Sequence, residues 1–206
     1  MTEKRDFLLE IGTEEIPARF MPWALEESRR LFSEALAEAH VEHEEVLTYG
    51  TPRRLAILAR SLSAKQEDRI EQYRGPLWSQ AFDATGNPTK AAIGFARSKD
   101  VQVDDLKSTF VNDQEYVLAE VRHRGKETVS ILPEICLGVI RRLVFPKNMF
   151  WEDPSIRYAR PIRWIVALWG DLVLPFRFGR IESGHMTRGH RFMGDKNLEI
   201  PSPKEY

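Results

Sequence analysis

Arginine and aromatic residues alternate in one part of this sequence, and that combination can bind nucleic acid. The residues concerned are Trp151, Arg157, Tyr158, Arg160, Arg163 and Trp164, followed later by Arg188, His190 and Arg191. A guanidinium group can bind a phosphate through two parallel hydrogen bonds, and an aromatic ring can stack on a base or on an arginine. The segment is therefore a candidate RNA surface.

Some of these residues also have a structural interpretation. Trp164 and Trp169 belong to an apolar predicted strand, residues 162–169, which favours a place in the core. Arg160 and Arg163 either contact RNA or form ion pairs with acidic residues of the N-terminal segment. The sequence leaves these two roles equally open.

A second group of candidates lies in a glycine-rich loop. Glu182, His185 and His190 are close together in the sequence and could form an acid/base cluster or a metal site. Two histidines and one acid in a loop are a common combination, so we favour a structural or RNA-contacting role. We expect no catalytic residue and no metal site in this chain.

The remaining candidates give weaker signals. His40 and His43 are three residues apart at the end of a predicted helix, but no third metal ligand accompanies them. Cys136 is the only cysteine and lies in an apolar helical stretch, which predicts a buried, inert thiol. The phosphate-binding patterns G-x-x-x-x-G-K-[ST] and G-x-G-x-x-G do not occur, nor does G-x-S-x-G.

Composition limits the class of protein. The 206 residues carry a net charge of −1, which excludes a uniformly basic coat for nucleic acid, but the charge is unevenly distributed. Residues 1–50 contain 5 basic and 12 acidic residues, whereas residues 141–191 contain 10 and 4. One cysteine, no signal-peptide pattern and no long apolar run predict a soluble cytoplasmic protein that does not contact a membrane.

Periodicity predicts the elements that must position these side chains. Strands are expected at residues 7–11, 46–48, 54–62, 110–111, 115–122, 162–169 and 172–178, and helices at 13–39, 90–97 and 127–144. Thr13 is the expected cap of the first helix. Because hairpins dominate and no regular strand–helix–strand repeat occurs, the prediction is an α+β fold with a mixed, largely antiparallel sheet and packed amphipathic helices.

Several sequence blocks in order resemble one family. They are LLEIGTEEIP at 8–17, GTPRRLA at 50–56, GNPTKAAIGFA at 86–96, FPKNM at 145–149, YARPIRWI at 158–165 and TRGHRF at 187–192. Together they resemble the β-subunit of bacterial heterotetrameric glycyl-tRNA synthetase over nearly the whole chain. The resemblance implies a fold similar to the B3/B4 region of the phenylalanyl-tRNA synthetase β-chain. It also implies an N-terminal fragment of a longer subunit, residues 1–206, with possible subdomains at about 1–75 and 76–206.

The resemblance also implies a division of labour. In that family the aminoacylation site, with its ATP and Mg, belongs to the α-subunit of an α2β2 assembly, and the β-subunit binds tRNA(Gly). Consistent with a non-catalytic subunit, Arg177 is not followed two residues later by the glutamate of a class II synthetase motif. The resemblance implies that the fragment is part of a glycine–tRNA ligase. No cofactor is expected in the fragment itself.

From the basic residues and the family blocks we predict a set that contacts tRNA phosphates. It comprises Arg53, Arg54, Lys147, Arg160, Arg163, Arg188 and Arg191. Two alternatives remain open: a domain that hydrolyses mischarged tRNA, with Glu182, His185 and His190 as its local candidates, and a module for subunit assembly alone.

Overall fold

The chain folds into two compact units, one inserted into the other. The computed structural model describes residues 3–151, 153–190, 194 and 197–206. The first unit comprises Met1–Glu67 and Lys126–Tyr206, and the second comprises Asp68–Gly125. The subdomains expected at about 1–75 and 76–206 assumed one boundary. An inserted unit has two boundaries. No local sequence pattern marks the points at which the chain leaves the first unit and returns to it.

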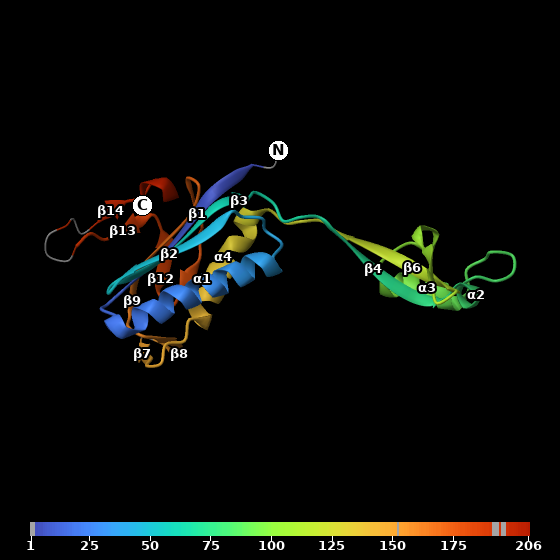
Figure 1. The fold of residues 1–206 in the computed structure, drawn as a ribbon, viewed down its shortest axis with the longest axis horizontal. Helices are drawn as coiled ribbons and strands as arrows, with labels where there is room; N and C mark the ends of the chain where they lie inside the picture. Colours follow the sequence, from blue (N-terminus) through green and yellow to red (C-terminus); the bar gives the residue numbers. More distant parts are fainter. Residues whose placement is uncertain (1–2, 152, 191–193, 195–196) are drawn as a thin grey trace. The chain divides into compact units, whose positions relative to one another are not determined.

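The first unit is built on a mixed β-sheet (Figure 1). In the described residues the strand order is β11-β12-β9-β1-β3-β2, and β10 also pairs with β9. Its strands are β1 (Lys4–Thr13), β2 (Glu45–Thr51), β3 (Arg54–Ser63), β9 (Ile162–Trp169), β10 (Leu172–Val173), β11 (Arg177–Phe178) and β12 (Ile181–Gly184). All pairs are antiparallel except β12 with β9. The predicted α+β class with a largely antiparallel sheet is confirmed.

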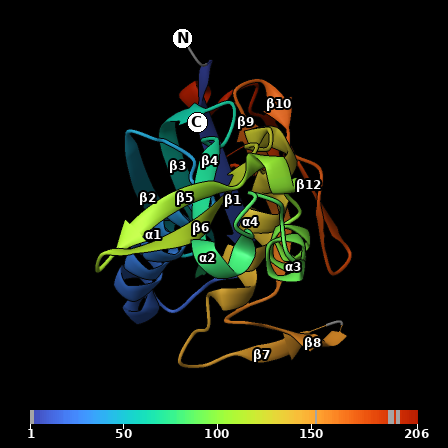
Figure 2. The same ribbon diagram turned by 90° about the vertical axis from the view of Figure 1, so that its right-hand side faces the viewer.

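Helices α1 (Met21–Glu38) and α4 (Thr128–Arg142) pack on one face of this sheet (Figures 1 and 2). Side chains alternate along a strand, so Phe7, Leu9 and Ile11 of β1 all face the helices. Phe7 stacks on Phe32 of α1 with ring centroids 4.7 Å apart. Burial of these apolar surfaces supplies the main stabilisation of the unit.

The predicted start of α1 at Thr13 is wrong. Thr13 ends β1, and a short 3₁₀ turn, η1 (Ala18–Phe20), precedes the helix. The residue before a proline is disfavoured in the helical region, so Pro17 delays the turn from strand to helix. The predicted strand at 172–178 is likewise divided into β10 and β11, because Pro175 has no N–H to continue the pairing.

The opposite face of the sheet carries a second, smaller apolar cluster. It consists of Leu8, Ala56, Trp164, Val166, Leu168 and Ile200. Short elements near the end of the chain are β13 (Met186–Thr187), β14 (Leu198–Glu199) and η3 (Pro203–Glu205), and Ile200 joins them to this cluster. This face is therefore only partly covered, and side chains on it are available for contacts.

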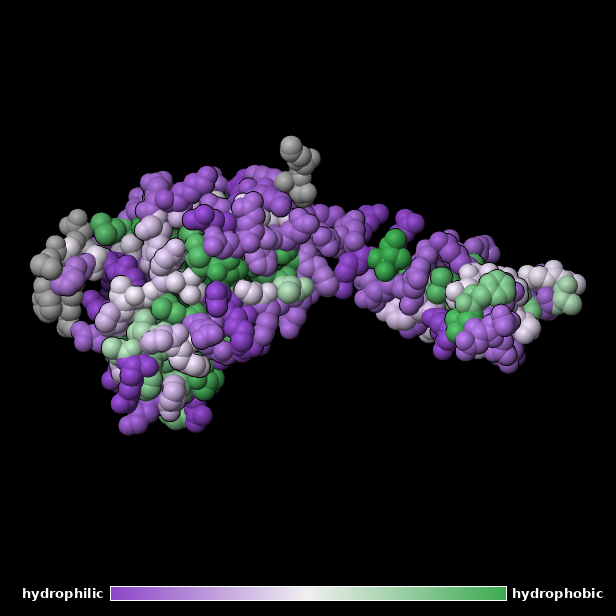
Figure 3. Space-filling view, viewed as in Figure 1, coloured by the Kyte–Doolittle hydropathy of each residue, from purple (hydrophilic) through white to green (hydrophobic). Residues whose placement is uncertain are grey.

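The hairpin of β7 (Met149–Trp151) and β8 (Asp153–Tyr158) follows α4. The inserted unit contains β4 (Arg69–Leu77), β5 (Lys107–Val111), β6 (Gln114–His123), α2 (Trp78–Ala81), α3 (Lys90–Ser98) and η2 (Val103–Asp105). Hydrophilic residues cover most of the face shown in Figure 3. Within the described residues, no helix combines the length and apolar character needed to cross a membrane.

Candidate nucleic-acid interface

Three arginines in the described part of the chain surround the ring of Trp164. Arg53 lies in the turn between β2 and β3, Arg54 is the first residue of β3, and Arg188 follows β13. Their guanidinium carbons lie 6.0, 5.8 and 5.0 Å from the ring centroid, respectively. At these distances the ring attracts the cations and restricts their positions. The three charges are therefore held together on one side of the sheet.

A buried carboxylate lies beside this group. Glu10 of β1 has no exposed surface, and it accepts hydrogen bonds from Trp164 Nε1 and, at 2.5 Å, from Thr187 Oγ1. Arg54 Nη1 lies 3.3 Å from Glu10 Oε2, and its Nη2 donates to the carbonyl of Arg188. A buried carboxylate is stable only when it is paired and hydrogen-bonded. These contacts therefore hold the Trp164 indole and the Arg54 guanidinium in place beside Glu10.

A cavity of about 530 Å³ lies next to these arginines. It is lined by Glu15, Thr51, Pro52, Arg53, Arg54, Gly189 and His190. Arg53 Nε is buried and has no hydrogen-bond partner among the described residues. The three guanidinium groups outnumber the carboxylates of Glu10 and Glu15, so the site favours an anion such as a phosphate.

Arg160 and Arg163 both contact the N-terminal segment: Arg163 forms an ion pair with an acidic side chain, whereas Arg160 contacts a backbone carbonyl. Arg163 Nε lies 2.9 Å from Glu14 Oε1, and Arg160 Nε donates to the carbonyl of Glu15 at 3.0 Å. The Arg163 side chain is nevertheless 48% exposed, so this is a surface ion pair. Such pairs contribute little stability, and the guanidinium stays accessible to another anion.

The structure does not bring every predicted residue to this site. Lys147 is exposed in the segment that follows α4, and it does not line the cavity beside Arg53 and Arg54. Arg191 lies outside the described residues. The site therefore contains Arg53, Arg54 and Arg188, with Arg160 next to it through Glu15, which also lines the cavity.

The acid and histidine candidates have other partners. Glu182 pairs with Arg177 across β11 and β12, and His185 Nε2 lies 3.6 Å from Glu199 Oε1. His40 follows Ala39, the C-terminal cap of α1, and has a φ of 50°, the left-handed backbone conformation that often follows the end of a helix. Among the described residues no group of three acids, histidines or cysteines is placed to hold a metal ion.

Cys136 is completely buried in α4, and burial raises the pKa of its thiol. A thiol whose ionised form is disfavoured is a poor nucleophile. The prediction of a buried cysteine is confirmed.

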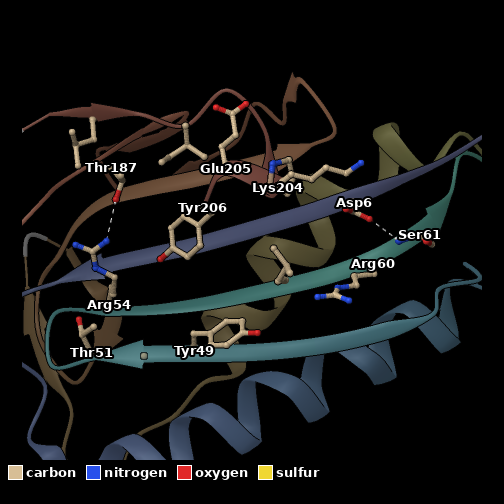
Figure 4. Close-up of a pocket in the computed structure, with 15 residues that line it drawn as sticks. Asp6, Tyr49, Thr51, Arg54, Arg60, Ser61, Thr187, Lys204, Glu205 and Tyr206 are labelled. Carbon is tan, nitrogen blue, oxygen red and sulfur yellow. Dashed lines mark hydrogen bonds between the residues drawn. The ribbon is translucent and has the colours of Figure 1, made fainter.

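Sequence reasoning missed Glu10, Thr187 and, apart from Arg54, the residues that line a second, larger cavity. Glu10 did carry a signal, because a single acid within an apolar strand, residues 7–11, must have a partner when buried. The larger cavity, about 1040 Å³, lies on the same face of the sheet as Trp164. Tyr49, Arg54, Arg60 and Tyr206 are among its lining residues (Figure 4).

Comparisons with known proteins bear on the whole chain. A family model described as the glycyl-tRNA synthetase beta subunit matches residues 7–206. The glycine–tRNA ligase beta subunits of Desulforamulus reducens, Bacillus subtilis and Halalkalibacterium halodurans are 43%, 45% and 47% identical over 98% of this chain. The match covers only 29%, 30% and 29% of those relatives, so this chain spans less than a third of their length.

Proposed function

Because this chain belongs to the glycyl-tRNA synthetase beta-subunit family, we propose that it is a tRNA-binding part of a glycine–tRNA ligase. In this proposal the complete enzyme attaches glycine to tRNA(Gly) in the cytoplasm, in an α2β2 assembly. ATP and Mg act at the α-subunit, and this chain contributes RNA contacts and no covalent chemistry.

The observation that supports RNA binding is the cluster of Arg53, Arg54 and Arg188 around Trp164. About half to two-thirds of protein–DNA hydrogen bonds are made to phosphate oxygens and sugars, and arginine forms the strongest contacts to phosphate. Here the guanidinium groups are already ordered by Trp164 and Glu10, so less side-chain freedom is lost when RNA binds. The adjacent 530 Å³ cavity leaves space for the phosphate.

The test is the salt dependence of tRNA(Gly) binding to the 206-residue chain. Each phosphate contact releases counterions, so Arg188→Ala should reduce the slope of log affinity against log salt concentration by about one. Arg29→Ala is the matched control, because Arg29 is exposed on α1, over the other face of the sheet. Equal slopes for the two variants, both with wild-type stability, would refute the proposal.

A role in subunit assembly is supported by a different observation. Val144, Met149 and Phe150 are 61%, 38% and 58% exposed near the β7–β8 hairpin, and Trp23 of α1 is 37% exposed. Large exposed apolar side chains that lie together are typical of protein interfaces. Co-elution with the α-subunit should weaken in Phe150→Asp and persist in Phe110→Asp, which alters an exposed residue of the inserted unit.

Hydrolytic editing has less support from the geometry. Glu182 and His185 each pair with another side chain, so these two do not converge on a common point. A deacylation assay with mischarged tRNA and the intact ligase tests this function directly. Turnover by the wild type that is lost in His185→Ala would support editing.

A further inference from the structure

Arg54 lies between two cavities on the same face of the sheet. Its side chain lines both the 530 Å³ cavity beside Arg53 and the 1040 Å³ cavity beside Tyr49, and Thr51 also lines both. The guanidinium is held between Glu10 Oε2 and the carbonyl of Arg188, so it cannot swing away from this boundary without losing both contacts. A ligand that fills both cavities must therefore pass this arginine.

The larger cavity has aromatic walls. Tyr49 of β2 is 53% exposed and Tyr206 is 39% exposed, and both rings project into the cavity from opposite sides (Figure 4). Leu58 of β3 and Ile200 contribute apolar surface between them. Flat aromatic groups that line an open groove provide stacking surfaces for nucleobases, which bind there with little sequence preference.

Tyr206 also connects this cavity with the arginine cluster. Burial raises the pKa of its phenol, and the charge of Glu10 and a hydrogen bond to that carboxylate raise it further, with Arg54 acting in the opposite direction. The ring therefore lies beside Arg54, where it borders the space that a base next to a bound phosphate would occupy. Arg60, Lys204, Asp6 and Glu205 line the same cavity and offer polar contacts to a base edge.

We infer that the two cavities together bind one unpaired nucleotide of RNA. Its phosphate lies in the smaller cavity beside Arg53, Arg54 and Arg188, and its base lies in the larger cavity with Tyr49 and Tyr206. This inference rests on the proposed tRNA-binding function and specifies the part of an RNA that is bound. A base within a duplex is paired and stacked, so it cannot enter the cavity, whereas single-stranded bases can.

The test compares a fluorescently labelled single-stranded RNA of ten nucleotides with a fully paired, blunt-ended RNA duplex of the same length. Loss of one stacking contact in Tyr49→Ala should weaken binding of the single strand by about 5- to 150-fold, because an aromatic–base stack contributes about 1–3 kcal/mol. Binding of the duplex should change less than twofold, because it has no unpaired base. The salt slope should be unaltered, because Tyr49 carries no charge.

Two further variants make the result specific. Tyr49→Phe keeps the stacking surface and should bind the single strand as the wild type does. Phe110→Ala is the matched control for loss of an exposed aromatic residue, since Phe110 is 70% exposed in the inserted unit. Thermal unfolding of each variant shows whether the fold is intact.

The outcomes separate this inference from the proposed function. Wild-type affinity of Tyr49→Ala for the single strand, with a reduced salt slope in Arg188→Ala, would overturn the nucleotide site and leave tRNA binding standing. Equal weakening of single strand and duplex in Tyr49→Ala would also overturn it. If Arg188→Ala also behaves like Arg29→Ala, both the site and the proposed function fail.

Discussion

The indole ring of Trp164 lies directly against Gly12 of the neighbouring strand. A Cβ atom added to Gly12 would be 1.9 Å from Trp164 Cε2, much closer than any real contact. The two residues are partners in the register of β1 and β9, on the face of the sheet that carries the arginine cluster. Glycine at this position therefore lets the ring lie flat on the sheet, where Arg53, Arg54 and Arg188 gather around it.

Gly12→Ala should therefore displace Trp164. Forcing extra volume into a packed site costs typically about 1–3 kcal/mol, so the free energy of unfolding in urea should fall by about that amount. Affinity for tRNA(Gly) should fall as well, because the displaced ring no longer orders the arginines. Gly138→Ala is the control: no atom lies within 4 Å of an added Cβ in α4, and stability should rise by about 0.5–1 kcal/mol. An unchanged stability of Gly12→Ala would contradict this account.

Glu10→Gln should destabilise the fold. Glu10 is completely buried and accepts hydrogen bonds from Trp164, Thr187 and Arg54. The amide has the same shape as the carboxylate, but its N–H₂ group cannot accept a hydrogen bond and it carries no charge to pair with Arg54. The free energy of unfolding should therefore fall by about 1–3 kcal/mol. Chemical denaturation measures this loss. Glu45→Gln is the control, since its carboxylate is exposed and 3.9 Å from Arg60, and it should change stability by less than about 0.5 kcal/mol.

Cys136 should react with thiol reagents only after unfolding. Burial raises the pKa of the thiol, so the thiolate is scarce in the folded chain even at pH 9. Labelling by a disulfide reagent at pH 8 should occur at the rate of unfolding, and it should be rapid in denaturant. Rapid labelling of the native chain would show that α4 opens locally at this residue.

Asp83 should make the inserted unit sensitive to acid. Its carboxylate accepts hydrogen bonds from the Thr85 hydroxyl at 2.6 Å and from the backbone N–H of Asn87 at 2.9 Å, and these contacts lower its pKa. A lowered pKa in the folded state gives stabilisation that is complete at neutral pH and is lost as the pH falls below about 4. Asp83→Asn should therefore be less stable than wild type at pH 7, and the difference should shrink as the pH falls below about 4. A difference that stays constant as the pH falls would indicate another cause.

Local patterns predicted many of the elements correctly. Alternating side chains located β3 and an apolar run located β9. The tight turn between β5 and β6 holds Asn112 and Asp113 at φ values of 49° and 61°. Strand β4 (Arg69–Leu77) was missed because none of its residues is fully buried, so its apolar signal is weak. Such elements depend on partners that are distant in the sequence.

The sequence by itself determined the α+β class, the family resemblance and the presence of an arginine-rich segment with interleaved aromatic residues. Only the tertiary structure decided which arginines act together, because Arg54 and Arg188 are 134 residues apart. They meet through the strand order β9-β1-β3, which places Trp164, Glu10 and Arg54 on one face of the sheet. Local sequence fixes the side to which each residue of a strand points, but the pairing of distant strands fixes its neighbours.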